Sequence, residues 1–277
     1  MSFLLSDRSE QRLAARCNPL RFDELGSGPV TVILLHGLFG SPDNWRPIME
    51  DLADHYRFFA LQLPIDYCGD RRHTSFQSLG QLTDHLADFF NEIVLTRAVL
   101  CGNSLGGQVA LDFCLRHPEC VEKLILTGSA GLFERDLSGG KLGRLSRDMV
   151  REQACQIFHD PVHVTDELVE SVYTMLVDRK YRRFLLRVAK ATRDRHMGDE
   201  LAHVDVPTRI IWGRNDTITP PFVGQQFRDR IRHAELTFID ECGHAPPIEQ
   251  PKEFARLLHS FLGDTTSDCG SIPCKPR

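Results

Sequence analysis

The chain has 277 residues, of which 42% are hydrophobic and 26% charged, which predicts a large globular unit with a sizeable core. Its net charge of −5 and its lack of a zinc-finger or RNP-type motif exclude the usual signature of nucleic-acid binding, so we expect no nucleic-acid partner. The sequence has neither a run of about 18 apolar residues nor a secretory signal pattern, so we expect no membrane span and a cytoplasmic location.

Short apolar runs alternate with segments of helical periodicity along most of the chain. Six runs predict strands at residues 30–36, 56–63, 97–102, 121–128, 208–213 and 234–240. Five segments with apolar residues at helical spacing predict helices at residues 41–54, 78–93, 105–118, 220–231 and 251–261. The alternation predicts an α/β fold with a mostly parallel, doubly wound sheet and helices on both faces.

The alternation stops between residues 131 and 206, where the pattern favours helices only. We therefore expect an all-helical cap at 131–206, inserted between the two parts of the core at 19–130 and 207–262. Residues 1–18 are expected to form an N-terminal arm, and residues 263–277 a flexible C-terminal tail.

Nine cysteines are scattered along the chain, and this odd number without a framework of paired spacings predicts free thiols in a reducing compartment. Cys269 and Cys274 lie close together in the predicted tail. No second pair accompanies them at metal-ligand spacing, so we expect no metal there.

The stretch GNSLG, at residues 102–106, follows a predicted strand and precedes a predicted helix. A serine on so tight a turn presents a free hydroxyl, and Gly102 and Gly106 supply the two positions where a Cβ would not fit. The following helix directs its N-terminal N–H groups and positive dipole end at Ser104. We predict that Ser104 is a nucleophile, against the alternative of a glycine-rich turn with an incidental serine.

A nucleophilic serine needs a base and an acid that orients the base, and both are expected at later strand ends. Asp216 follows the strand at 208–213, and His244 lies in a loop beyond the strand at 234–240, so these two residues complete the predicted set. Asp240 is the main rival acid, and Glu134 and Asp136 are weaker ones, since they lie several residues beyond their strand. Cys242 lies near the predicted base, which raises the hypothesis that a thiol reagent blocks the site.

A tetrahedral intermediate needs two fixed donors for its oxyanion. The backbone N–H of Leu105, directly after the predicted nucleophile, is one candidate. The second is expected from the HGLFGS loop after the first strand, with Leu38 preferred and Phe39 as the alternative. His36 opens this loop, and we expect it to brace the loop rather than act as a base.

The predicted substrate pocket draws on both the core loops and the cap. Its candidate lining residues are aromatic or lie beside the predicted site: Phe39, Phe133, Tyr181, Phe184 and Ala245. Residues 180–196 place apolar residues on one helical face and six basic residues mostly on the remainder. The basic residues predict either a rim that attracts an anionic substrate or an ordinary solvated face, and the solvated face is the preferred interpretation.

The motifs LLHGLFGS, CGNSLGG, IIWGRNDTITP and CGHAPPIEQP together resemble the α/β-hydrolase superfamily with a helical cap, over residues 19–262. The order Ser104, Asp216, His244 matches the chain order of the triad in that superfamily. The stretch HGLFGSPDNW is similar to small carboxylesterases, while GNSLGG and WGRND are also similar to meta-cleavage-product hydrolases, which cut carbon–carbon bonds. The resemblance implies no metal and no organic cofactor.

Two departures from the superfamily patterns bear on the substrate. The loop after the second strand, LPIDYCGDRRHTSF, lacks the glycine-rich pattern of many relatives. Ala245 stands where the carbon–carbon hydrolases usually carry a tryptophan, directly after the catalytic histidine, which weakens that interpretation. A serine nucleophile also argues against the haloalkane dehalogenase and epoxide hydrolase branches, which use an aspartate.

The sequence therefore predicts a serine hydrolase that cleaves small-molecule carboxylic esters of small to medium acyl chain through an acyl-enzyme. The alternatives are a carbon–carbon bond hydrolase of the meta-cleavage-product type and a non-catalytic small-molecule receptor on the same fold. The sequence leaves the oligomeric state open between monomer and homodimer.

Overall fold

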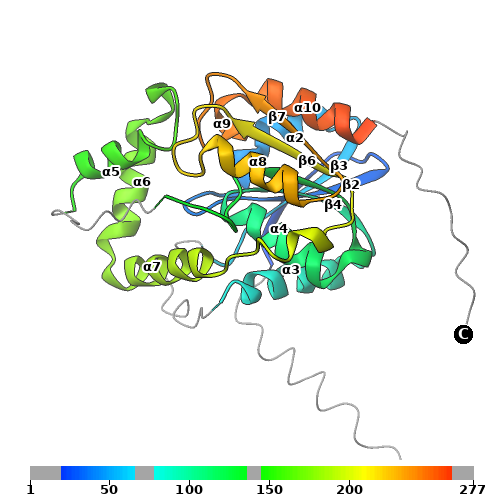
Figure 1. Cartoon of the computed structure of the whole chain (residues 1–277). Helices are drawn as coiled ribbons and strands as arrows, with labels where there is room; N and C mark the ends of the chain where they lie inside the picture. Colours follow the sequence, from blue (N-terminus) through cyan, green and yellow to red (C-terminus); the bar gives the residue numbers. More distant parts are fainter. Residues whose placement is uncertain (1–19, 66–77, 136–144, 264–277) are drawn as a thin grey trace, which may run out of the picture.

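The computed structural model describes residues 20–65, 78–135 and 145–263, and its centre is one twisted sheet with the strand order β1-β3-β2-β4-β5-β6-β7 (Figure 1). The strands are β1 (Phe22–Leu25), β2 (Val30–Leu35), β3 (Tyr56–Leu61), β4 (Ala98–Asn103), β5 (Val121–Thr127), β6 (Thr208–Gly213) and β7 (Ala234–Ile239). All neighbours pair in parallel except β1, which runs antiparallel to β3 at the edge. The predicted α/β class and mostly parallel sheet are confirmed.

Side chains of β2 show how the sheet divides the core. Ile33 and Leu35 pack on one face, in a cluster that includes apolar residues of α3 (Gly80–Glu92), α4 (Leu105–Arg116) and α8 (Pro221–Arg230). Val32 and Leu34 pack on the other face, with α2 (Arg46–Leu52) and α10 (Pro251–Gly263). Because successive strand residues point to opposite faces, a continuous apolar run is buried on both sides, as the sequence predicts.

Strand β1 and the helix boundaries differ in detail from the sequence prediction. The segment FDEL of β1 carries two acidic residues and is only partly buried at the sheet edge, so it lacks the apolar run that signals an inner strand. The helix predicted at 41–54 divides into a 3-10 turn (Pro42–Trp45) and α2, where Pro47 occupies the first turn. Further short helical turns are α9 (Pro246–Glu249) and the 3-10 turns Pro118–Cys120, Pro161–His163 and Leu201–His203.

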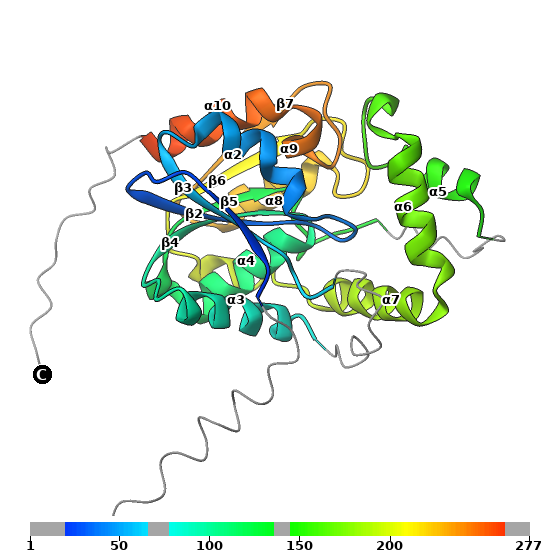
Figure 2. The ribbon, with the colours of Figure 1, turned by 180° about the vertical axis from the view of Figure 1, so that it is seen from behind.

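The described part of the chain between β5 and β6 is helical and contains no strand. It forms α5 (Arg147–Ala154), α6 (Asp166–Val177) and α7 (Arg179–Asp194), which lie together at the end of the sheet where the parallel strands finish (Figures 1 and 2). The side chains of Ser146, Thr165 and Asp178 cap the N-termini of these helices by accepting backbone N–H bonds. Within the described residues, none of the helices is long and apolar enough to cross a membrane.

Candidate active site

Ser104 lies at the junction of β4 and α4 in a strained conformation, with φ 54° and ψ −119°. The turn is held by backbone bonds from Ser104 N to Thr127 O (3.0 Å) and from Ala130 N to Ser104 O (3.1 Å). A Cβ on Gly102 would lie 2.3 Å from Gly106 O, and one on Gly106 would lie 2.1 Å from Leu35 O, so neither position accepts a side chain. The steric argument made from the sequence for these glycines is confirmed.

Asp216 and His244 are brought together by the loops that follow β6 and β7. His244 Nδ1 lies 2.9 Å from Asp216 Oδ2, and both residues are buried. Asp216 Oδ1 accepts the backbone N–H groups of Ile218 (2.8 Å) and Thr219 (2.9 Å), a local motif that fixes the carboxylate. With Oδ2 facing the imidazole, Asp216 is placed to hold His244 in the tautomer that carries its proton on Nδ1.

The histidine loop lies directly against the serine turn. Asn103, the residue before Ser104, donates from Nδ2 to the backbone oxygens of His244 and Thr127, each at 3.1 Å. A Cβ on Gly128, next along the chain from Thr127, would lie 3.0 Å from His244 Nδ1. The loop of the predicted base therefore lies against the turn of the predicted nucleophile, at the carboxyl ends of β4 and β5, where an open parallel sheet forms its sites.

The turn at residues 37–40 forms another wall of the site. It closes with a bond from Gly40 N to Gly37 O (3.1 Å), and a Cβ on Gly37 would lie 3.1 Å from Ser104 Cβ. Leu38 is half-buried in this turn, and Phe39 has a positive φ of 64°. Leu105 is the first residue of α4, so its N–H is one of those that lack an acceptor within the helix. The assignment of the oxyanion donors stays a prediction.

His36 is buried at the root of this turn and braces it. Leu63 N donates to His36 Nε2 (3.1 Å), so Nε2 is an acceptor and Nδ1 carries the proton that is donated to Gly37 O (2.8 Å). Both ring nitrogens are thus engaged by the backbone, which agrees with the bracing role expected from the sequence.

Of the three rival acids, one is at the surface, one lies near His244 and one is outside the described residues. Asp240 is exposed and pairs with Arg214. Glu134 is half-buried and close enough to act on His244 through its charge, but the direct hydrogen bond belongs to Asp216. Asp136 lies outside the described residues.

His244 is surrounded by carboxylates, and this sets its pKa. Burial alone would lower the pKa, but the charge and hydrogen bond of Asp216, with the charges of Glu134 and Glu249, outweigh burial and raise the pKa above 6.5.

A base must be neutral to accept the serine proton, so protonation of His244 abolishes its action. We expect kcat/KM for an uncharged substrate to fall about tenfold per pH unit on the acid side of a midpoint above 6.5. A pH profile on the free enzyme tests this, and a midpoint below 6.5 would contradict it.

Phe39 and Phe133, two of the predicted pocket residues, are exposed, and the ring of Phe133 lies 5.5 Å from that of Phe222. Tyr181 and Phe184 are instead buried in the core, where Tyr181 Oη donates to Ile65 O (2.5 Å). Ala245 is buried beside His244. That these residues line a substrate pocket stays a prediction.

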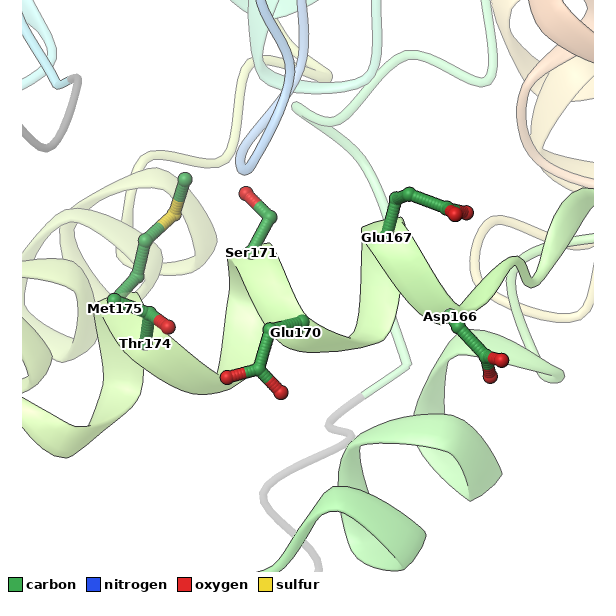
Figure 3. A pocket seen from close by; sticks show the side chains of 6 residues that line it. All are labelled: Asp166, Glu167, Glu170, Ser171, Thr174 and Met175. Carbon is green, nitrogen blue, oxygen red and sulfur yellow. The ribbon is translucent and has the colours of Figure 1, made fainter.

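A cleft of about 660 Å³ runs along α6 and is lined by Asp166, Glu167, Glu170, Ser171, Thr174 and Met175 (Figure 3). Glu167, Ser171 and Met175 point to one side of the helix, while Asp166 and Glu170 point to the other (Figure 3). On that second side, ion pairs join Asp166 to Arg151 and Glu170 to Arg147, both of α5. None of the predicted pocket residues is among the six.

The five cysteines within the described residues are free thiols, and two of them differ sharply in exposure. Cys242 is fully buried, and burial raises the pKa of its thiol, followed by the charges of Glu249 and Asp216, whereas Cys155 is exposed. Because the thiolate is the reactive form, we expect iodoacetamide to modify Cys155 and to leave Cys242 unmodified in the folded protein. Peptide mapping by mass spectrometry, with a urea-unfolded control in which both react, measures this. Equal rates at the two sites would show that the loop opens and would support the hypothesis of a thiol-blocked site.

Three polar residues of the site were not identified from the sequence. Thr219 Oγ1 lies 2.8 Å from Asp216 Oδ2 and 3.2 Å from His244 Nδ1, so it contacts both partners. Asn103 joins the serine and histidine loops, and Glu249 accepts backbone bonds beside His244. The spacing of two of them in the sequence could have indicated a role. Thr219 follows Asp216 by three residues, as in a side-chain-capped turn, and Glu249 follows His244 by five residues.

No group of three or more His, Cys, Asp and Glu side chains in the described ranges is arranged to hold a metal ion.

Comparison with known proteins places the chain among hydrolases. A curated relative from Metapseudomonas resinovorans, 2-hydroxy-6-oxo-6-(2'-aminophenyl)hexa-2,4-dienoic acid hydrolase, is 30% identical over 87% of both chains. Among solved structures, an α/β hydrolase enzyme from the metagenome of lagoon sediments at Mar Chica, Morocco, is 29% identical, with a TM-score of 0.70 over 90% of this chain and 100% of that one. The meta-cleavage product hydrolase of Pseudomonas fluorescens IP01 is 25% identical, with a TM-score of 0.76 over 88% and 94%.

The sequence profile of the alpha/beta hydrolase family matches residues 32–257, a range that runs from β2 into α10 and includes Ser104, Asp216 and His244. The chain therefore belongs to the alpha/beta hydrolase family.

Proposed function

We propose that this hydrolase attacks a substrate carbonyl with Ser104 and passes through an acyl-enzyme. The observation that carries the proposal is the buried 2.9 Å hydrogen bond between His244 and Asp216, held by Asn103 against the strained turn of Ser104. This arrangement supplies a nucleophile, a base and an orienting acid in one place.

In the proposed first step, Ser104 Oγ bonds to the carbonyl carbon while its proton passes to His244 Nε2. Asp216 keeps the Nδ1 proton in place and stabilises the imidazolium. The N–H groups of Leu105 and Leu38, or of Phe39 in place of Leu38, are the proposed donors to the oxyanion. His244 then gives its proton to the leaving group. Water, deprotonated by His244, releases the acyl group as a carboxylic acid and restores Ser104.

For the bond that breaks, we favour the carbon–carbon bond of a 2-hydroxy-6-oxodienoate, which was the alternative in the sequence analysis. The relatives support this order: the Metapseudomonas resinovorans protein is named for such a substrate, and the Pseudomonas fluorescens structure is a meta-cleavage product hydrolase. In that reaction the 2-hydroxyl proton first moves to C5, which converts the dienol to the 2,6-dioxo form. When the C5–C6 bond of the tetrahedral intermediate then breaks, its electron pair leaves on a conjugated dienolate, and His244 gives its proton to the 2-oxygen of that fragment.

Carboxylic ester hydrolysis is the second candidate. It is favoured by Ala245, which stands where the carbon–carbon hydrolases usually carry a tryptophan. Both reactions use the same three residues, so the identity of the bond depends on the pocket. We further propose that the helical segment at 131–206 acts as a cap over the site and sets substrate specificity.

A two-substrate assay decides between these functions. The purified chain would be given a 2-hydroxy-6-oxo-6-phenylhexa-2,4-dienoate, whose dienol absorbance disappears on cleavage, and p-nitrophenyl esters of increasing acyl length. A kcat/KM for the dienoate well above that for every ester supports the carbon–carbon reaction, and the reverse supports an esterase. Labelling of the chain by a fluorophosphonate, mapped to Ser104, tests the nucleophile independently of substrate. Tight ligand binding with neither turnover nor labelling would leave the receptor alternative.

A further inference from the structure

Glu249, in the short helix α9, is a buried carboxylate that accepts hydrogen bonds from three backbone N–H groups. Its Oε2 accepts from Gly243 N (2.9 Å) and from His159 N (2.7 Å), and its Oε1 accepts from Ala245 N (3.0 Å). The residue is 7% exposed. The carboxylate therefore accepts three charge-assisted hydrogen bonds. Removing this acceptor would leave three backbone N–H groups buried without a partner.

The donors bracket His244. Gly243 precedes it and Ala245 follows it, so Glu249 fixes the backbone on both sides of the proposed base. The peptide of His244 itself donates to Ile157 O (2.8 Å). The orientation of the imidazole is therefore determined at its backbone by Glu249 and residues 157–159, and at its ring by Asp216.

The third donor, His159 N, belongs to the helical segment between β5 and β6. The same stretch also receives a bond from the acid loop, from Thr217 Oγ1 to Gln156 O (2.7 Å). Residues 156–159 thus contact both the loop of Asp216 and the loop of His244, and Glu249 joins this stretch to the histidine loop.

We propose that Glu249 is a positioning residue for catalysis, which holds the His244 loop in its working place and ties it to residues 156–159. The proposal rests on the catalytic role proposed for His244. The charge of Glu249 acts in the same direction as that of Asp216 and Glu134, since all three raise the pKa of His244. A displacement of about 1 Å in a catalytic group is enough to cost on the order of a hundredfold in rate.

Two variants separate the effect of the side-chain length of Glu249 from the effect of its charge. Glu249→Gln keeps the length of the side chain but loses the charge and one acceptor, and Glu249→Asp keeps the charge but loses the reach to three donors at once. We expect kcat to fall about 10- to 100-fold in both, with KM within about threefold of the parent. The acid midpoint of kcat/KM is expected to move to lower pH in Glu249→Gln and to stay near that of the parent in Glu249→Asp.

Glu253→Gln is the matched control, because Glu253 lies four residues further along the chain, on α10, and pairs with Arg256 at the surface. It is expected to leave kcat, KM and the pH profile unchanged. NMR titration of the His244 ring protons in the parent and Glu249→Gln gives the pKa shift without any assay of turnover.

The outcomes are distinct. An inactive parent contradicts the proposed function, while the NMR shift still shows whether Glu249 governs the imidazole. An active parent with unchanged kcat and His244 pKa in the variants overturns the role of Glu249. A rise in KM alone, or failure of both variants to fold, would assign Glu249 to binding or to stability and would overturn it equally.

Discussion

Replacing Ser104 with alanine is expected to lower kcat about a millionfold, as removal of the nucleophile does in other serine hydrolases. Without Oγ no acyl-enzyme forms, and the remaining groups can act only on water. The fold should persist, because the strained backbone at φ 54° is set by contacts of Gly102, Gly106 and Thr127 rather than by the serine hydroxyl. Turnover of the better of the two substrates, together with the melting temperature, measures both effects.

Ser260→Ala is the control for this substitution, since Ser260 is exposed on α10 and alanine is a strong helix former. Its turnover should equal that of the parent. If Ser104→Ala keeps more than about a thousandth of the parent kcat, another group is the nucleophile and the proposed mechanism is wrong.

Asp216→Asn is expected to lower kcat about ten-thousandfold while leaving the fold intact. The substituted amide could keep the acceptor bonds from Ile218 N and Thr219 N through its oxygen, but its N–H₂ group facing His244 would favour the wrong imidazole tautomer. Loss of the carboxylate also removes the largest effect that raises the pKa of His244, so the acid midpoint of the residual activity should move to lower pH. Steady-state kinetics across pH measure the two effects together.

Asp240→Asn gives the matched comparison, because Asp240 was the rival acid and the structure pairs it with Arg214 at the surface. Its kcat is expected to stay within about twofold of the parent. Equal losses in the two variants would show that the acid role is not specific to Asp216.

The sequence predicts the strands and the serine turn well because these features depend on local sequence. Buried parallel strands are continuous apolar runs, as in β2, and the GNSLG turn needs glycines for a steric reason that any backbone of that shape imposes. Asp216 and His244 are predicted partners of Ser104 because both follow later strands whose carboxyl ends meet at the same edge, and their order along the chain matches the superfamily that the sequence resembles. Strand β1 was missed because its four residues take their structure from pairing with β3 rather than from their own pattern.

The supporting contacts of the site could not be predicted in the same way. Thr219 and Glu249 act through side chains that meet partners in other loops, and no periodicity encodes such a meeting. The predicted pocket residues Tyr181 and Phe184 share a helical face, and that face packs into the core. Helical spacing identifies a buried face, but it does not say whether a ligand or the protein covers it. For the same reason, the choice between carbon–carbon cleavage and ester hydrolysis depends on the comparison with relatives.

The bonds that residues 156–159 make to the loops of Asp216 and His244 limit how this chain can exchange parts with its relatives. A helical segment transplanted between β5 and β6 must bring two backbone acceptors and a backbone donor at the places of Gln156, Ile157 and His159, in addition to the substrate contacts that we propose for it. A chimera joined at the strand ends would replace these three backbone groups together with the rest of the helical segment. Natural recombination and laboratory grafting therefore face the same restriction: a replacement segment fits only if its backbone bonds to the loops of Asp216 and His244 in the same way.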